Sequence, residues 1–264
     1  MKPNRFKQVL AEGRMPVGHM LLEFVTRGIP LMLQEAGVDF VLIDMEHTGL
    51  TLANIADVMA WFKATTVAPF VRVPPKQLDF IPRVLDVGAL GIMMSDVRSA
   101  AEARAVVDAA KYPPLGMRGV ALRTANTDFR PVKPDEFLKY ANENTTVICM
   151  IESQEGLNHI DDILVVPGVD VLWVGHFDLS LDLGIIGQFQ HPKMVEALKL
   201  IADAARRHGK AAVMQPANLV QAREWLDLGF NVMSCAADFF FYVDALKQYV
   251  ADVRKLGVEL GAVK

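Results

Sequence analysis

Eight short apolar segments alternate with amphipathic segments along the chain, and this alternation limits the possible folds more than any other feature. Most of the short segments are apolar at every position, which is typical of strands covered by helices. Successive parallel strands need a crossover between them, so eight strand–helix pairs predict an α/β protein with a (β/α)8 barrel. The expected strands are Val17–Met20, Phe40–Ile43, Ala68–Val73, Gly91–Met94, Val147–Ile151, Val171–Val174, Ala211–Met214 and Asn231–Cys235.

The segments between these strands have helical periodicity and end at glycine-containing turns, where helices commonly stop. No linker, repeat or low-complexity tract interrupts the sequence, so residues 1–264 are predicted to form a single domain. An open doubly wound sheet is the alternative. Its dinucleotide-binding version is disfavoured because no G-x-G-x-x-G follows the first strand. The clearest expected helices are Leu52–Lys63, Ala100–Ala110, Pro192–His208 and Leu219–Leu228.

Composition excludes several classes of protein. Hydrophobic residues make up 52% of the chain and charged residues 22%, so a large core is expected and disorder is not. With 27 basic and 31 acidic residues, the net charge of −4 argues against a nucleic-acid partner. Two cysteines do not make a disulfide framework, which favours a reducing compartment. No signal peptide is visible and no uncharged stretch approaches the ~20 residues that span a bilayer, so we expect a cytoplasmic protein without a membrane partner.

Two carboxylates follow neighbouring strands of the expected barrel. Glu152 comes directly after the fifth strand and Asp178 shortly after the sixth. Catalytic groups of barrel enzymes lie at the carboxyl ends of the strands, and oxygen ligands suit Mg²⁺ or Mn²⁺. A dication there would polarise a carbonyl group and stabilise an enolate. The alternative is helix capping, by Asp178 and Ser180 or by Glu155.

Further polar residues lie at the ends of the second and third strands. His47 is a candidate general base, and Asp44 could hold its second ring nitrogen. By strand alternation, Glu46 lies on the same face as Asp44. Which of the two carboxylates reaches the ring therefore stays open. The alternative is that His47 is a polar loop residue. Arg72 offers forked donors to a carboxylate or keto oxygen, or it forms a structural salt bridge with Glu152 or Asp44.

Two other segments carry expectations. Lys111–Thr145 follows the fourth strand, and we expect it on the barrel face that carries functional loops, with its Arg118 and Arg123 binding either an anionic substrate or another subunit. The run Phe239–Tyr242 contains four consecutive aromatic residues, which cannot all face one core. We therefore expect part of this segment to pack against a second subunit.

Several segments together resemble the HpcH/HpaI aldolase/citrate lyase family. The similarity runs in order from about Gly18 to Asp238, nearly the whole chain. The segments that carry it are Leu42–His47, Lys111–Gly119, Ile151–Leu157, Pro167–Asp170 and Gly175–Ser180, continuing to Leu183-Gly184 and Gly187-Gln188.

The resemblance implies a (β/α)8 barrel and a class II aldolase that depends on a divalent metal (Mg, Mn or Co) and on no organic cofactor. Such enzymes reversibly cleave 4-hydroxy-2-oxo acids into pyruvate and an aldehyde, in aromatic or sugar-acid catabolism. By position, Glu152 and Asp178 would hold the metal, which chelates pyruvate. Arg72 would stabilise the enolate oxygen, and His47 oriented by Asp44 would transfer protons.

The resemblance also implies how substrate and subunits are held. Backbone N–H groups around Phe177 and Asp178, next to Gly175, would bind the substrate carboxylate. Members of the family tend to form hexamers, as trimers of dimers, with the last helix exchanged between subunits. The aromatic run after the eighth strand is consistent with such an exchange.

The chain departs from the family pattern at positions that would face the substrate. Met150 stands where many such aldolases have Gln, and His176-Phe177 stands in place of Pro-Ala. His19-Met20 lies where Trp is common. These departures leave the aldehyde open and admit hydroxypyruvate in place of pyruvate.

Three alternative functions stay open. The first is decarboxylation of an oxaloacetate-like acid, which passes through the same enolate. The second is a lyase acting on a CoA thioester, although no basic surface for CoA is evident in the sequence. The third is a barrel that binds 2-oxo acids without catalysis.

Overall fold

The computed structural model describes residues 1–262, and its centre is a closed barrel of eight parallel strands. Each strand pairs with the next along the chain, and the eighth pairs with the first. This confirms the predicted (β/α)8 barrel, and most strand boundaries lie within one residue of expectation. The strands are β1 (Val17–Leu21), β2 (Phe40–Asp44), β3 (Ala68–Arg72), β4 (Gly91–Met94), β5 (Thr146–Ile151), β6 (Val171–Val174), β7 (Ala211–Met214) and β8 (Val232–Ala237).

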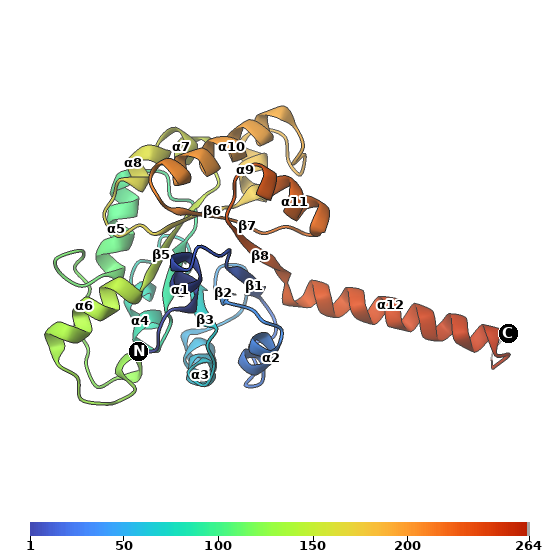
Figure 1. Cartoon of the computed structure of the whole chain (residues 1–264), viewed down its shortest axis with the longest axis horizontal. Helices are drawn as coiled ribbons and strands as arrows, with labels where there is room; N and C mark the ends of the chain where they lie inside the picture. Colours follow the sequence, from blue (N-terminus) through green and yellow to red (C-terminus); the bar gives the residue numbers. More distant parts are fainter. Residues whose placement is uncertain (263–264) are drawn as a thin grey trace.

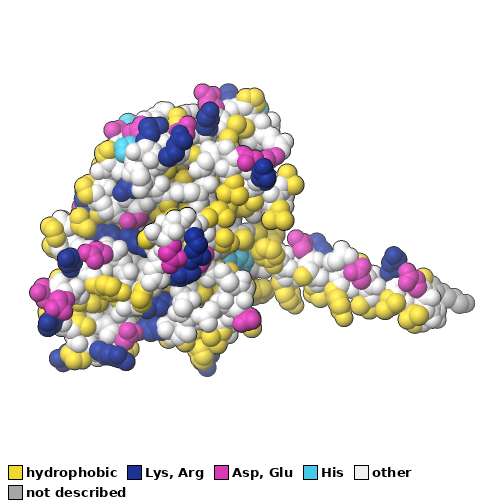
Figure 2. Space-filling view, viewed as in Figure 1, with side chains coloured by type: hydrophobic (Ala, Val, Ile, Leu, Met, Phe, Trp, Pro, Cys, Tyr) yellow, Lys and Arg dark blue, Asp and Glu magenta, His cyan; other side chains and the backbone are white. Residues whose placement is uncertain are grey.

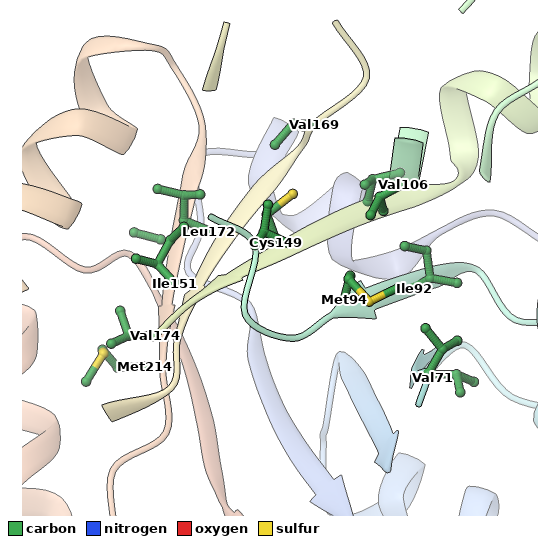
Figure 3. Packing of buried hydrophobic residues seen from close by; sticks show 14 of the residues in the cluster. Val71, Ile92, Met94, Val106, Cys149, Ile151, Val169, Leu172, Val174 and Met214 are labelled. Carbon is green, nitrogen blue, oxygen red and sulfur yellow. The ribbon is translucent and has the colours of Figure 1, made fainter. Parts of the chain in front are cut away.

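Helices surround the barrel, and the buried outer faces of the strands pack against them. Figure 3 shows part of this layer, in which Cys149 and Ile151 of β5 lie near Leu172 and Val174 of β6. The helices are α1 (Arg5–Ala11), α2 (Ile29–Glu35), α3 (Leu52–Phe62), α4 (Phe80–Asp86), α5 (Ala100–Ala110), α6 (Pro134–Asn144), α7 (Gln154–Asn158), α8 (Ile160–Leu164), α9 (His176–Asp182), α10 (Pro192–Arg207), α11 (Leu219–Asp227) and α12 (Asp238–Glu259), with a short 3₁₀ turn η1 at Ala125–Thr127.

A second buried cluster fills the inside of the barrel. It includes Phe40 and Leu42 of β2, Phe70 of β3 and Met150 of β5. Phe6 of α1 packs edge-on against Phe40 and Phe70, with ring centroids 5.1 and 5.4 Å apart, and so closes the amino-terminal end. Because side chains alternate in and out along a strand, the next inward positions are those at the carboxyl ends of the strands.

The segment Lys111–Thr145 does not lie where the sequence analysis placed it. It follows helix α5, which returns the chain to the amino-terminal end of the barrel, and it contains η1 and α6. Arg118 is 3% exposed, donates a hydrogen bond to Asp86 and lies over the ring of Tyr112. The expected position of this segment on the face with the functional loops is therefore wrong, and Arg118 is a structural residue, whereas Arg123 is exposed.

Helix α12 projects away from the barrel (Figure 1). Asp238 is its one buried residue, whereas Phe240, Phe241 and Tyr242 of the aromatic run are more than half exposed. Hydrophobic side chains are visible along the projecting helix in Figure 2. Within residues 1–262, no helix is long and apolar enough to cross a membrane.

Candidate active site

A pocket of about 240 Å³ opens at the carboxyl ends of the barrel strands. Trp173, Leu42 and Met150 form its floor from inward positions of three strands. Seven of the eight candidate residues from the sequence line it, and the eighth, Asp44, bonds directly to two of them. The seven are His47, Arg72, Met150, Glu152, Gly175, Phe177 and Asp178.

Arg72 is fixed in the pocket by two carboxylates. Asp44 and Arg72 are register partners on β2 and β3, and Asp44 receives two hydrogen bonds of 2.7 Å from Arg72 Nε and Nη2. Arg72 Nη1 also lies 3.1 Å from Glu46 Oε2. Although burial alone lowers the pKa of Arg72, these partners raise it above its ordinary value, so the guanidinium stays charged. The salt bridge to Asp44 therefore exists and orients the cation in the pocket wall.

The surroundings of His47 answer the question that the sequence left open. The Asp44 carboxylate accepts hydrogen bonds from Arg72 and from the backbone N–H groups of Glu46 and His47, so it holds the loop rather than the imidazole ring. Glu46 is the carboxylate near the ring, with Oε2 3.9 Å from His47 Nε2. Ser95 donates a hydrogen bond to the same Glu46 oxygen. The imidazole is exposed at the rim of the pocket.

Glu152 lies in an environment that disfavours its ionised form. Burial, followed by the charges of Asp178, Glu46 and Asp96, raises the pKa of Glu152 to about 7, although Arg72 opposes the shift. The carboxyl group fits only because residue 175 is glycine. A Cβ on Gly175 would overlap Glu152 Oε2 and lie 2.8 Å from Glu152 Cβ.

Asp178 lies in the first turn of α9, and its carboxylate does not cap the helix. Gly175 occupies the N-cap position, where no side chain bonds to the helix, so the capping role considered for Asp178 is not observed. Ser180 donates to the Phe177 carbonyl and accepts from the backbone N–H of Gly187. The backbone N–H groups in the first turn of a helix have no hydrogen-bond partner within the helix. In α9 these groups belong to His176, Phe177 and Asp178, which line the pocket.

Aromatic side chains flank this turn. His176 lies 4.8 Å from Phe177 and 4.9 Å from Phe189, measured between ring centroids, and 5.3 Å from Trp225. Burial lowers the pKa of His176 to about 4, so its ring is neutral at pH 7. Phe177 is 58% exposed at the pocket edge.

The donor groups of the pocket are compatible with a divalent cation. Glu152 and Asp178 offer carboxylate oxygens, the ligands that Mg²⁺ and Mn²⁺ prefer, and the raised pKa of Glu152 reflects first its burial and then the negative charges near it. Across residues 1–262, no cluster of three or more His, Cys, Asp or Glu side chains is arranged to hold a metal. Two protein ligands would therefore leave the remaining coordination positions to substrate and solvent.

Several pocket residues were not among the sequence candidates. Gln215 directly follows β7, and its side-chain nitrogen donates to the Ala236 carbonyl. Leu22, Phe239 and Phe240 complete the wall beyond β1 and β8. Gln215 follows the end of β7, so the criterion that selected Glu152, a polar residue at a strand end, could have found it. The same criterion does not find apolar wall residues.

The chain is similar to known proteins over nearly its whole length. Residues 27–245 match the model of a family described as HpcH/HpaI aldolase/citrate lyase. A 5-keto-4-deoxy-D-glucarate aldolase of Citrobacter koseri is 32% identical over 256 residues, which is 96% of this chain and 97% of that protein.

Solved structures have the same fold. The crystal structure of an HpcH/HpaI aldolase from Desulfitobacterium hafniense has a TM-score of 0.86 at 35% identity, covering 95% of this chain and 96% of that one. The citrate synthase SbnG has a TM-score of 0.84 at 27% identity, covering 95% and 98%.

Proposed function

Because the chain belongs to the HpcH/HpaI aldolase/citrate lyase family, we propose that its barrel pocket reversibly cleaves a 4-hydroxy-2-oxo acid into pyruvate, or hydroxypyruvate, and an aldehyde. The chain is an enzyme of the aldehyde-lyase type. The observation that carries the assignment of the site is the convergence of Glu152, Asp178 and Arg72 on one pocket. We infer a physiological role in the catabolism of aromatic or sugar-derived acids and a cytoplasmic location.

Glu152 and Asp178 would hold the divalent cation, which is Mg, Mn or Co. When bound, this cation supplies positive charge to the carboxylate and the 2-oxo oxygen of the substrate. Gly175 gives the Glu152 carboxyl group the space to reach that position. Backbone N–H groups of Phe177 and Asp178 would hold the substrate carboxylate, and Met150 would lie beneath the substrate.

Arg72 would stabilise the 2-oxo oxygen as negative charge develops on it during cleavage. Its two carboxylate partners hold the guanidinium in place before the reaction begins, so little reorganisation accompanies the step. His47 would remove the proton from the C4 hydroxyl group as the C3–C4 bond breaks, with Glu46 beside its ring and Asp44 fixing the backbone of its loop.

A Schiff-base mechanism would instead need a lysine in the pocket. Among residues 1–262, no lysine lines it, and Lys210 precedes β7 and donates to the Val169 carbonyl at the opposite end of the barrel. Borohydride is therefore expected not to trap pyruvate on the protein.

The direct test measures pyruvate released from a 4-hydroxy-2-oxo acid in the presence of Mg²⁺ or Mn²⁺. We expect EDTA to stop the release and added metal to restore it. Glu152→Ala and Asp178→Ala should each abolish both the activity and its dependence on metal. Full metal-stimulated turnover in either variant would show that the substituted residue is not a ligand.

We further propose that the chain forms a homo-oligomer, a hexamer built as a trimer of dimers, with α12 exchanged between subunits. Support comes from exposed apolar residues that recur every three or four positions, which places them on one face of α12. A projecting 22-residue helix gains stability by packing such a face against protein. The residues of this stripe are Tyr242, Leu246, Tyr249, Val253, Leu256 and Leu260.

A further inference from the structure

The pocket has a polar half and an apolar half, and the two halves are lined by residues from different strands of the barrel. The polar half lies over β2, β3, β5 and the start of α9, where His47, Arg72, Glu152 and Asp178 are found. Since the reacting 2-oxo acid would bind there, the part of the aldehyde beyond its carbonyl group must extend toward the other half.

The apolar half lies over β8 and β1, which pair with each other. Met20 and Leu22 line it from β1 and the residue that follows, and Ala237, Phe239 and Phe240 line it from the end of β8 and the start of α12. Met20 and Ala237 are buried, and Leu22 and Phe239 pack on the apolar interior of the barrel. This wall therefore offers side-chain surface without hydrogen-bonding groups.

No free cation faces the apolar half. Arg72 is the one Lys or Arg among the described residues that line the pocket, and it is already bound to Asp44 and Glu46. Gln215 is the one amide side chain among the described lining residues; its nitrogen donates to the Ala236 carbonyl, and an amide carries no charge to compensate a carboxylate. A carboxylate at the far end of an aldehyde would lose its water here without gaining a partner, which is unfavourable.

The backbone N–H groups near the apolar half already have hydrogen-bond partners. The N–H groups of Leu22, Glu23 and Phe24 point to one spot, an arrangement that binds anions. The Asp238 carboxylate occupies it, at 2.7 Å from Phe24 N and 2.9 Å from Glu23 N, and it also accepts from Phe239 N. Asp238 is 5% exposed and does not line the pocket, so these N–H groups are already bonded and are not open to a ligand.

We propose that this enzyme selects an uncharged aldehyde with an aliphatic or aromatic tail over an aldehyde that carries a carboxylate or hydroxyl groups. The inference rests on the proposed aldolase function and extends it to the second substrate. In the synthetic direction, C3 of pyruvate loses a proton and forms a bond to the aldehyde carbon. The aldehyde oxygen takes up a proton and becomes the C4 hydroxyl group, so no further reactant is needed.

Pairs of aldehydes with matched shape test the proposal in the metal-loaded enzyme. Succinic semialdehyde and 4-methylpentanal differ in a carboxylate against two methyl groups, and glyceraldehyde and 2-methylbutanal differ in hydroxyl groups against methyl groups. We expect kcat/KM for aldol addition of pyruvate to favour the apolar member of each pair by at least about tenfold. Equal values, or preference for the polar member, would overturn the proposal.

A substitution at Phe240 tests whether the apolar half of the pocket is what causes the aldehyde preference. Phe240→Arg puts a cation beside the apolar half, and it should lower the preference for 4-methylpentanal over succinic semialdehyde by at least about tenfold. Phe241→Arg is the matched control. Phe241 is the next residue of α12 and is about as exposed as Phe240, with an exposed fraction of 56% against 53%, but it does not line the pocket. The ratio of two aldehydes does not depend on the fraction of folded enzyme. An unchanged ratio in Phe240→Arg would contradict the assignment of the wall.

Metal-dependent exchange of the pyruvate C3 protons with D₂O distinguishes a failure of the proposed aldehyde preference from a failure of the proposed aldolase function. Exchange combined with a preference for polar aldehydes overturns this inference and leaves the aldolase function in place. Failure of exchange with both pyruvate and hydroxypyruvate contradicts the aldolase function, and the inference falls with it.

Discussion

At the scale of single residues, the pocket brings more negative than positive charge together. Asp44, Glu46 and Glu152 act on the charge of Arg72, which is 7% exposed, and Asp178 acts on that of Glu152. Such a group of carboxylates is unfavourable unless cations compensate it, and the arginine compensates only part of it. Arg72 is held in a fixed position by its two partners, and the proposed dication would compensate the remaining negative charge.

Replacing Arg72 tests its role in stabilising the oxyanion. Arg72→Ala should lower turnover by a factor of ~10²–10³, the usual effect of losing one electrostatic stabiliser. Arg72→Lys keeps the charge but loses the forked contact with Asp44, so its turnover should fall between those of the wild type and the alanine variant. Steady-state kinetics on folded protein, checked by circular dichroism, decide the matter. A loss below about threefold in Arg72→Ala would make the residue purely structural.

Glu152 should make the metal-free protein less stable as pH rises. Its pKa rises from 4.5 to about 7 on folding, so the folded chain keeps the proton where the unfolded chain has lost it. The stability linked to that proton is full below pH 4.5 and is lost as pH rises through 7. In EDTA at pH 8, Glu152→Gln should thus be more stable than the wild type by about 1–3 kcal/mol, because a glutamine carries no buried charge.

Urea unfolding at pH 8 and pH 4.5 measures this difference. At pH 4.5 the two proteins should be nearly equal, since Glu152 is then protonated when folded. A variant less stable than the wild type at pH 8 would contradict the account of the site.

These residues also show how far the sequence alone reaches. Glu152, Asp178 and Arg72 were located because each lies at or shortly after the carboxyl end of a strand, where barrel enzymes carry their catalytic groups. This criterion could not decide the partner of His47, since that depends on the path of the loop after β2, where Asp44 bonds to the backbone and Glu46 lies near the ring. Loop geometry is set by such local bonds rather than by periodicity.

At the scale of elements, the turn between β6 and α9 brings the two proposed ligands together. Gly175 has a negative φ of −81°, so it does not use the left-handed region that favours glycine, and glycine is needed there for space. The element after β4 shows the opposite case. The boundaries of α5 were predicted correctly, but the position of Lys111–Thr145 was wrong because the intervening helix reverses the direction of the chain.

Gly175→Ala should displace the Glu152 carboxyl group, because the added Cβ would occupy its place. We expect the apparent affinity for Mn²⁺ to fall by at least about tenfold, the size of effect seen when the support of a metal ligand is disturbed. Isothermal titration calorimetry measures the affinity directly. Gly119→Ala is the matched control, because a Cβ on Gly119 meets no atom within 4 Å. Unchanged affinity in Gly175→Ala would remove Glu152 from the site.

At the scale of the whole molecule, α12 is the element whose apolar side chains stay exposed to solvent in the isolated chain. The aromatic run predicted that this segment would not pack fully on its own barrel, and Phe240, Phe241 and Tyr242 are indeed exposed. Phe240 lines the pocket of its own chain, whereas in the proposed assembly a second chain covers Phe241 and Tyr242, a contact that no pattern within one sequence specifies.

The proposed assembly predicts a particle with six times the mass of the chain in analytical ultracentrifugation. Leu246→Lys combined with Val253→Lys puts two charges into the apolar stripe and should shift the protein to smaller species. Gln248→Lys combined with Ala251→Lys adds the same charge away from the stripe and should leave the mass unchanged. A wild-type monomer at micromolar concentration would contradict the proposed exchange of α12.

Proton exchange at C3 of pyruvate is the measurement that tests the central claim most directly, because it reports enolate formation without requiring the aldehyde. The protein is incubated with pyruvate in D₂O, with and without Mn²⁺ or Mg²⁺, and the methyl signal is followed by NMR. The account predicts loss of the signal that requires metal, stops with EDTA and disappears in Asp178→Ala. Persistence of the C3 proton signals with metal present, for hydroxypyruvate as well as for pyruvate, would contradict it.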